Sequence, residues 1–109
     1  MLNLSVGDPP AITSELEDVT VTSPEAVSLQ CTVDLGNPKA SIEWFKNDKP
    51  ISSGRKYDVS CEDGVAKLVV KESEFCDAGA YRVVASNKLG SAQSQCSVTV
   101  YCKFANYIC

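Results

Sequence analysis

Cysteine is the residue type with the most chemistry to offer in this 109-residue sequence. Thiols can form disulfides, bind metals or act as nucleophiles. Six are present, at Cys31, Cys61, Cys76, Cys96, Cys102 and Cys109. An even number permits a disulfide framework, with fifteen possible pairings among six thiols. No Cys-x-x-Cys spacing occurs and histidine is absent, so a zinc site is poorly supported and we predict no metal centre.

The sequence lacks the residue patterns that most catalytic sites need. Without histidine there is no His-based triad and no histidine general base. No Gly-x-Gly occurs, so a phosphate-binding glycine loop is not expected either. We therefore predict a non-enzymatic chain with no catalytic residues and no cofactor, although a parent protein could carry a kinase domain elsewhere.

Acidic residues outnumber basic ones, 14 to 10, which gives a net charge of −4. Nucleic acids and anionic membranes attract clustered cations, so this balance argues against both as partners. We expect a solvated surface from the acidic residues 15, 17, 18, 62, 63, 72 and 74. A cation-binding cluster is the alternative, but these residues fall on different predicted loops and strands. No run of eighteen apolar residues occurs, so no transmembrane helix is predicted.

Short runs in which apolar residues alternate with polar ones recur along the chain, and this period is typical of half-buried strands. Strands are expected at 27–33, 41–46, 56–61, 65–70, 80–86 and 92–100. Ile12, Leu16, Val19 and Val21 mark a split first strand, and Ile51 anchors a short edge segment. Turn residues separate these runs about every 8–12 residues, which predicts an all-β sandwich. No segment shows a convincing helical period.

The stretch Asp77-Ala78-Gly79-Ala80-Tyr81 joins two of the predicted strands. An Asp, a Gly and a Tyr that enters the next strand are in the order of a tyrosine corner. In such a corner the hydroxyl of a buried phenol finds a backbone partner. Gly79 permits the tight backbone that this turn needs.

These residues resemble the immunoglobulin superfamily, and its intermediate (I) set in particular, over about residues 9–101. Cys31, Trp44 thirteen residues later, the Asp77–Tyr81 corner and the Ala85–Ala92 hairpin carry the resemblance. The resemblance implies an antiparallel two-sheet β-sandwich. The strand of Cys31 would face the strand of Val83, with Trp44 packed between them and Leu68 in the core. It also implies an ion pair between Arg55 and Asp77 at one end of the domain.

One position departs from the family pattern: Val83 stands where the family has its second cysteine. No inter-sheet disulfide is therefore expected at the usual place, and Cys31 is expected to be a reduced core residue. A bond from Cys31 to Cys96 on the opposite sheet remains an alternative, provided that the Cα atoms lie within about 7 Å. Free surface thiols are expected at Cys76, Cys102 and Cys109.

The subgroup most similar to this sequence is the tandem domains of giant muscle proteins such as titin, obscurin and twitchin. The resemblance implies a structural and mechanical module in the cytoplasm, within the sarcomere, that binds neighbouring immunoglobulin-like or fibronectin-like domains and other sarcomeric or cytoskeletal proteins. Force would be carried where Val19 and Val21 pair with the strand of Val98 and Val100. Two alternatives stay open: an extracellular recognition or adhesion module of a receptor, and an interaction domain attached to a cytosolic kinase.

The chain is expected to divide into a flexible leader at 1–8, one domain at 9–101 and a C-terminal tail or linker at 102–109. Asn3-Leu4-Ser5 is a formal glycosylation acceptor in the leader, although its occurrence there is explained by chance. The tail is apolar for a linker. It could dock on the domain, begin the next module or bind a partner strand.

Overall fold

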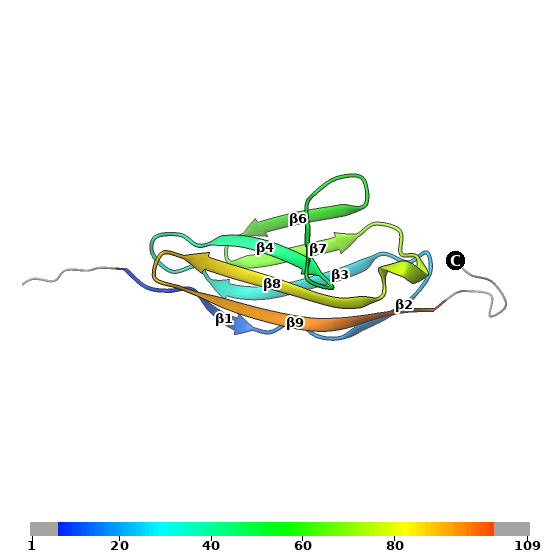
Figure 1. Cartoon of the computed structure of the whole chain (residues 1–109), viewed down its shortest axis with the longest axis horizontal. Coiled ribbons are helices and arrows are strands. Elements are labelled where there is room, and N and C mark those ends of the chain that lie inside the picture. Colours follow the sequence, from blue (N-terminus) through cyan, green and yellow to red (C-terminus); the bar gives the residue numbers. More distant parts are fainter. Residues whose placement is uncertain (1–6, 102–109) are drawn as a thin grey trace, which may run out of the picture.

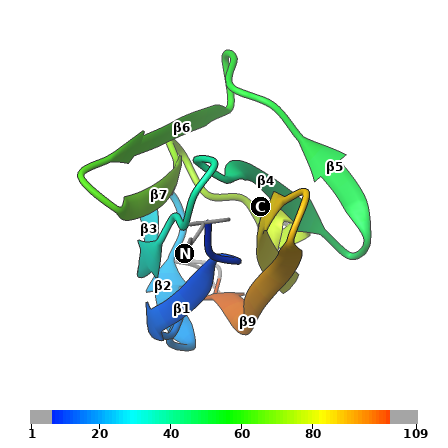
Figure 2. The same cartoon turned by 90° about the vertical axis from the view of Figure 1, so that its left-hand side faces the viewer.

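The computed structural model describes residues 7–101, which form two β-sheets packed face to face (Figures 1 and 2). One sheet has four strands in the order β1-β3-β7-β6, and the other has five in the order β2-β9-β8-β4-β5. The strands are β1 Ala11–Ser14, β2 Val19–Thr22, β3 Val27–Asp34, β4 Ser41–Lys46, β5 Lys49–Ile51, β6 Tyr57–Glu62, β7 Val65–Val70, β8 Gly79–Asn87 and β9 Gly90–Tyr101. The predicted all-β sandwich is therefore confirmed.

Within residues 7–101, a single turn of 3-10 helix, η1 Phe75–Asp77, is the one element that the periodicity did not predict. A hydrophobic period cannot show within three residues, so the pattern carried no signal for it. The chemical signal is Glu74 three residues before Asp77. The Glu74 backbone N–H donates to the Asp77 carboxylate at 2.7 Å, and the Asp77 N–H donates to the Glu74 carbonyl at 2.8 Å.

The core lies between the two sheets and follows from the alternation of side chains along each strand. In β3 every second residue is buried, beginning with Val27, and the residues between them are exposed. Trp44 on β4 lies opposite Val83 on β8, and both are buried in the same cluster as Cys31 and Leu68. Removing this apolar surface from water is the main force that joins the sheets.

The first strand is split between the two sheets, as the sequence predicted. β1 pairs antiparallel with β3, while β2 pairs parallel with β9 in the other sheet. The chain crosses the edge of the sandwich between them, and Leu16 in this crossover is buried, with 6% of its surface exposed. Both sheets thus gain a strand from one short segment.

Residues 1–6 and 102–109 lie outside the described residues. With them lie most of the predicted leader, the whole predicted tail, the Asn3 acceptor, Cys102 and Cys109. Asp8, which belongs to the predicted leader, exchanges two backbone hydrogen bonds with Asn37, at 2.8 and 2.9 Å. Among residues 7–101, no helix is long and apolar enough to cross a membrane.

We expect Leu68→Ala to lower the free energy of unfolding by about 2–5 kcal/mol, because Leu68 is fully buried and its removal leaves a cavity. Ser60→Ala on the neighbouring strand is the control, and its exposed side chain should change stability by no more than about 0.5 kcal/mol. Equilibrium denaturation with urea measures both. Equal effects would contradict a core centred on Leu68.

Candidate functional site

β2, the second half of the split first strand, pairs parallel with β9, the last strand of the described residues. Val19 lies opposite Val98, and Val21 lies opposite Val100. The Ser23 N–H continues the ladder by donating to the Tyr101 carbonyl at 2.8 Å. The four residues predicted to bear force therefore lie in one short ladder, in the expected register.

Two hydrogen bonds at the end of β2 show toward which side each backbone N–H of this strand points. The Thr22 N–H donates to the Glu25 carboxylate at 2.9 Å, whereas the Ser23 N–H donates to β9. Because amides alternate in direction along a strand, the N–H groups of Val19 and Val21 face β9 and that of Thr20 faces away. Val19 and Val21 are thus the bonded positions of the ladder.

Side chains of the crossover tie the segment before β2 to β9. The Leu16 N–H donates to the Ser94 hydroxyl at 2.9 Å, and that hydroxyl donates to the Glu15 carboxylate at 2.6 Å. The Asp18 carboxylate accepts a bond from the Ser97 N–H at 2.8 Å. Sequence reasoning missed these residues. A polar Ser94 at an inward position of an alternating strand was the signal that could have revealed them.

The two ends of the described chain lie at opposite poles of the sandwich (Figure 1). β2 and β9 run in the same direction, toward the pole at which β9 ends with Tyr101. A pull on the two ends would draw the start of β2 and the end of β9 in opposite directions along their own axes. The ladder between them would be sheared rather than unzipped.

The predicted tyrosine corner is closed by a short hydrogen bond. The hydroxyl of buried Tyr81 donates to the Asp77 carbonyl at 2.6 Å. Gly79 has a φ of +151°, and a Cβ there would lie 2.8 Å from the Asn47 side-chain oxygen. That oxygen accepts a bond from the Ala80 N–H, so glycine leaves room for the contact that locks the corner.

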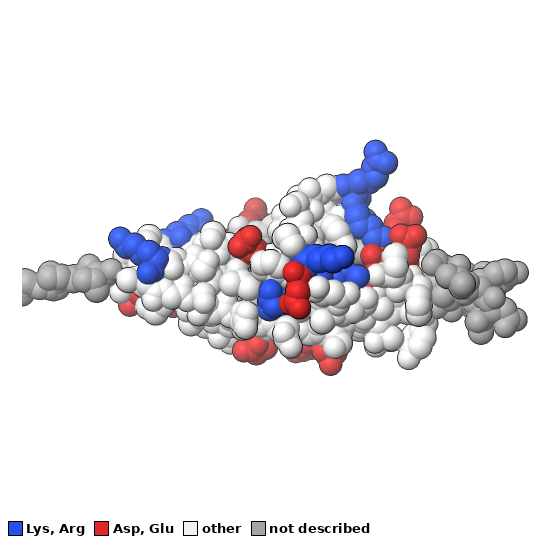
Figure 3. All heavy atoms as spheres, viewed as in Figure 1, with Lys and Arg blue, Asp and Glu red and all other residues white. Residues whose placement is uncertain are grey.

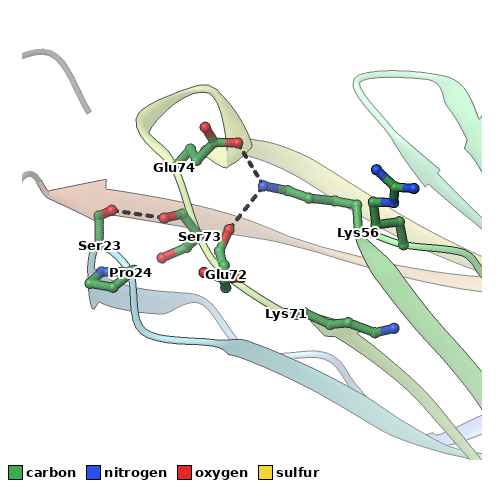
Figure 4. Close-up of a pocket in the computed structure, with 8 residues that line it drawn as sticks. Ser23, Pro24, Lys56, Lys71, Glu72, Ser73 and Glu74 are labelled. Atoms are coloured by element: carbon green, nitrogen blue, oxygen red, sulfur yellow. Dashed lines mark hydrogen bonds and ion pairs between the residues drawn. The ribbon is translucent and has the colours of Figure 1, made fainter.

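The predicted ion pair between Arg55 and Asp77 is wrong, because the partner of Asp77 is the next residue, Lys56. The Lys56 ammonium lies 2.7 Å from the Asp77 carboxylate and 2.9 Å from that of Glu74. Its nitrogen also donates to the Glu72 carbonyl at 2.9 Å. Figure 4 shows Lys56 extending toward Glu74 and Glu72.

The position of the backbone explains why Lys56, and not Arg55, pairs with Asp77. The Lys71 N–H donates to the Lys56 carbonyl at 3.0 Å, which places Lys56 in register with the end of β7 and beside η1. Arg55 belongs to the preceding loop and is exposed. Asp77 is buried, so its carboxylate needs a cation and hydrogen-bond donors, and Lys56 with the Glu74 amide supplies them.

These contacts also set the pKa of Lys56. Desolvation alone would lower it, but hydrogen bonds and charge attraction from Asp77 and Glu74 outweigh that effect and raise the pKa to about 12. A cation with a raised pKa stabilises the fold fully below its ordinary value of 10.5. That stabilisation is lost as the pH rises through about 12.

A cleft of about 550 Å³ lies beside this network (Figure 4). Its wall includes Lys56, Lys71 and Glu74, together with Ser23 and Ser73. The Ser23 hydroxyl donates to the Ser73 carbonyl at 2.8 Å and ties the turn after β2 to the segment before η1. Two segments of the cleft wall, the turn after β2 and the segment before η1, are therefore already joined by a hydrogen bond.

All four cysteines within residues 7–101 are unpaired. Cys31 and Cys96 are buried, and burial raises the pKa of each thiol to about 11. Cys31 and Cys61 both lie opposite Ala66 on the strand between them. Strands two places apart are separated by about 9.5 Å, which is too far for a disulfide. The two buried thiols, Cys31 and Cys96, thus serve as small apolar side chains.

Acidic and basic side chains are interspersed on the face shown in Figure 3. One surface pair joins Arg82 to Asp48 at 2.8 Å, and the same guanidinium stacks 4.6 Å from the centre of the Phe45 ring. Within residues 7–101, no three Cys, Asp or Glu side chains are grouped so as to hold a metal ion. The polar side chains described above instead form hydrogen bonds and ion pairs between segments that are far apart in the sequence.

A family model described as "Immunoglobulin I-set domain" matches residues 10–100. The chain belongs to this family. Among curated proteins, this I-set domain is 39% identical over 92 residues to the muscle M-line assembly protein unc-89 of Caenorhabditis elegans, and 43% identical over 94 residues to hemicentin-2 of Mus musculus. These matches cover 84% and 83% of the chain, but only 1% and 2% of those proteins.

Solved structures of titin domains share the fold. The titin tandem A164–A165 matches with a TM-score of 0.80 and 32% identity, over 88% of this chain and 49% of that one. The complex of titin M10 with an obscurin-like 1 Ig domain matches with a TM-score of 0.84 and 27% identity, over 89% and 98%. This I-set domain thus resembles modules of giant muscle proteins.

We expect Lys56→Met to lower the free energy of unfolding by about 1–3 kcal/mol, because it leaves the buried Asp77 carboxylate without its cation. Arg55→Met is the matched control and should lie within about 0.5 kcal/mol of the parent. Denaturation midpoints between pH 7 and pH 12 measure both. Stability of the parent should fall above pH 10.5, and the fall should be smaller in Lys56→Met, in which the raised pKa values of the buried thiols and Tyr81 still lower stability at high pH. If Arg55→Met lowered the free energy of unfolding more than Lys56→Met does, the predicted ion pair between Arg55 and Asp77 would be favoured instead.

Thiol labelling followed by peptide mapping tests the cysteines. In the native protein Cys76, which is exposed, should be alkylated rapidly at pH 8. Cys31 should react far more slowly because it is buried and its pKa is about 11. Both should react at the same rate in denaturant. Recovery of Cys31 in a disulfide-linked peptide, or equal native rates, would contradict a reduced core thiol.

Proposed function

We propose that this I-set domain is a force-bearing link in a tandem chain of domains. The observation that carries the proposal is the parallel β2–β9 ladder, placed between ends that leave from opposite poles. Hydrogen bonds pulled along the strand axis share the load, so several must break together before the fold opens. Each is worth only about 1 kcal/mol at equilibrium, but their simultaneous rupture raises the barrier.

The crossover bonds strengthen this arrangement. Ser94 holds both the Leu16 amide and the Glu15 carboxylate, and Asp18 holds the Ser97 amide just ahead of the ladder. A pull that enters through β1 meets these bonds before it reaches Val19. Since they join the same two segments as the ladder, they add to the number of contacts that a shearing force must break.

The comparisons support an array and a muscle setting. The solved titin fragment A164–A165 is itself described as an Ig tandem, and unc-89 is described as a muscle M-line assembly protein. We infer that this domain lies among similar domains of a sarcomeric protein, and that it binds Ig-like neighbours. The absence of histidine from the whole sequence supports a role without catalysis.

Single-molecule stretching of Val21→Pro tests the ladder. Proline has no amide hydrogen, so it removes a bond at a position whose N–H faces β9. We expect a sharp fall in unfolding force, with a similar fall for Val19→Pro. Thr20→Pro is the matched control in the same strand, because its amide faces away from β9 and the ladder keeps its bonds.

Equilibrium stability must be measured for each variant, because proline also acts on the unfolded chain. Ser52→Pro, in a loop far from the ladder in sequence, provides a second reference. If unfolding force merely follows equilibrium stability across these variants, the ladder has no special mechanical role. A parent domain that unfolds at very low force would also count against the proposal.

A further inference from the structure

The hairpin of β4 and β5 places two lysines directly opposite each other. Lys46 is the last residue of β4 and Lys49 is the first of β5, and they are partners in the ladder. Directly opposite residues of an antiparallel pair lie on the same face, so both side chains leave the hairpin from one side. Like charges in this arrangement destabilise the pairing. Folding alone would therefore favour a neutral or acidic residue at one of the two positions.

No carboxylate within residues 7–101 neutralises this lysine pair, because every ion pair among those residues belongs to Lys56 or Arg82. The Asp48 carboxylate, in the turn of the same hairpin, lies 2.8 Å from the Arg82 guanidinium. The Lys46 ammonium donates to the Cys76 carbonyl at 2.9 Å. A carbonyl carries no net charge, and an ammonium has two further N–H groups to donate. Both positive charges of the pair therefore remain uncompensated within residues 7–101.

The two lysines line a pocket of about 230 Å³ between the hairpin and the start of β6. Its other described lining residues are Asn47, Pro50, Ile51 and Tyr57. The lining thus offers two ammonium groups, an amide and a phenol, all of which can donate hydrogen bonds, and among the described residues it includes no carboxylate. A hollow with two positive charges and several donors suits an anion.

One carboxylate acts on this pocket from behind Tyr57. Burial, and after it the charge of Asp77, raises the pKa of Tyr57, so Asp77 lies within electrostatic reach of the pocket wall. The Asp77 carboxylate is 2.7 Å from the Lys56 ammonium, however, and accepts a hydrogen bond from the Glu74 N–H. It is already paired, so it leaves the charges of the two hairpin lysines available to a ligand.

We propose that this pocket binds a dianionic phosphate group, supplied either as inorganic phosphate or as a phosphorylated side chain of another protein. Such a group carries a charge of nearly −2 at pH 7 and has three strong acceptor oxygens, which matches two cations and several donors. A carboxylate carries a single negative charge and would leave one ammonium uncompensated. Lysine binds phosphate as a point charge, so the site needs no fixed fork of donors. The pocket lies apart from the β2–β9 ladder, so this proposal does not depend on the force-bearing role.

The decisive variant is Lys49→Met, which removes one charge from an exposed side chain and keeps its apolar stem. Calorimetric titration of the whole chain with a phosphoserine peptide at pH 7.5 and constant ionic strength should show a Kd raised at least about tenfold, because a charge-assisted hydrogen bond is lost. Lys88→Met is the matched control: it changes the net charge equally in the exposed turn between β8 and β9, and it should bind as the parent does. A parent that does not bind, or an equal loss in both variants, would overturn the proposal.

The identity of the anion is tested by its charge. The second pKa of a phosphate ester is about 6, so lowering the pH from 7.5 to 5.5 should weaken phosphoserine binding about fourfold. Sulfate stays dianionic over this range and should bind equally at both pH values, and the chain has no histidine to titrate between them. The same peptide with aspartate in place of phosphoserine should bind at least about tenfold more weakly at pH 7.5. Equal binding of the two peptides would contradict recognition of a dianion.

Thermal unfolding gives a readout that also checks folding. Without a ligand Lys49→Met should melt at or above the temperature of the parent, because it relieves the repulsion with Lys46. Inorganic phosphate should raise the melting temperature of the parent but not that of Lys49→Met, with sodium chloride at equal ionic strength as the reference. Binding of inorganic phosphate as tight as that of the phosphoserine peptide would identify free phosphate as the ligand, whereas tighter binding of the peptide would identify a phosphorylated partner. A melting temperature that responds equally to phosphate in both proteins would overturn the proposal.

Discussion

The packing of one sheet against the other is the interaction on which the rest of this domain depends, because no disulfide within residues 7–101 joins them. Val83, Trp44 and Cys31 meet in a buried cluster where the family pattern has a covalent bond. A disulfide stabilises mainly by restricting the unfolded chain, whereas apolar packing acts on the folded state. Stability here therefore follows from how completely the two faces exclude water.

Because packing is non-directional, other contacts must fix the ends of the domain. At the pole where β9 ends, Asp77 gathers the Tyr81 hydroxyl, the Glu74 amide and the Lys56 ammonium. At the crossover, Ser94 gathers the Leu16 amide and the Glu15 carboxylate. Each is a buried polar residue with several partners, and such groups specify geometry because leaving them unpaired is costly.

The mechanical proposal and the stability of the fold depend on different parts of the molecule. Leu68 and Trp44 lie in the centre of the sandwich, where they oppose unfolding from any direction. The β2–β9 ladder lies at one edge, and its contribution depends on the direction of the pull.

Local pattern in the sequence was enough to determine the strands, the inward residues, the split first strand and the tyrosine corner, because each follows from side-chain alternation or from the needs of one turn. The tertiary structure alone decided that Lys56 rather than Arg55 pairs with Asp77, and that Ser94 and Asp18 clamp the crossover. These contacts join segments of the chain whose relative positions cannot be read from the alternation within each strand. Periodicity assigns a residue to a face, but a polar contact depends on distances of about 3 Å between separate loops, and only the packed sheets set those distances.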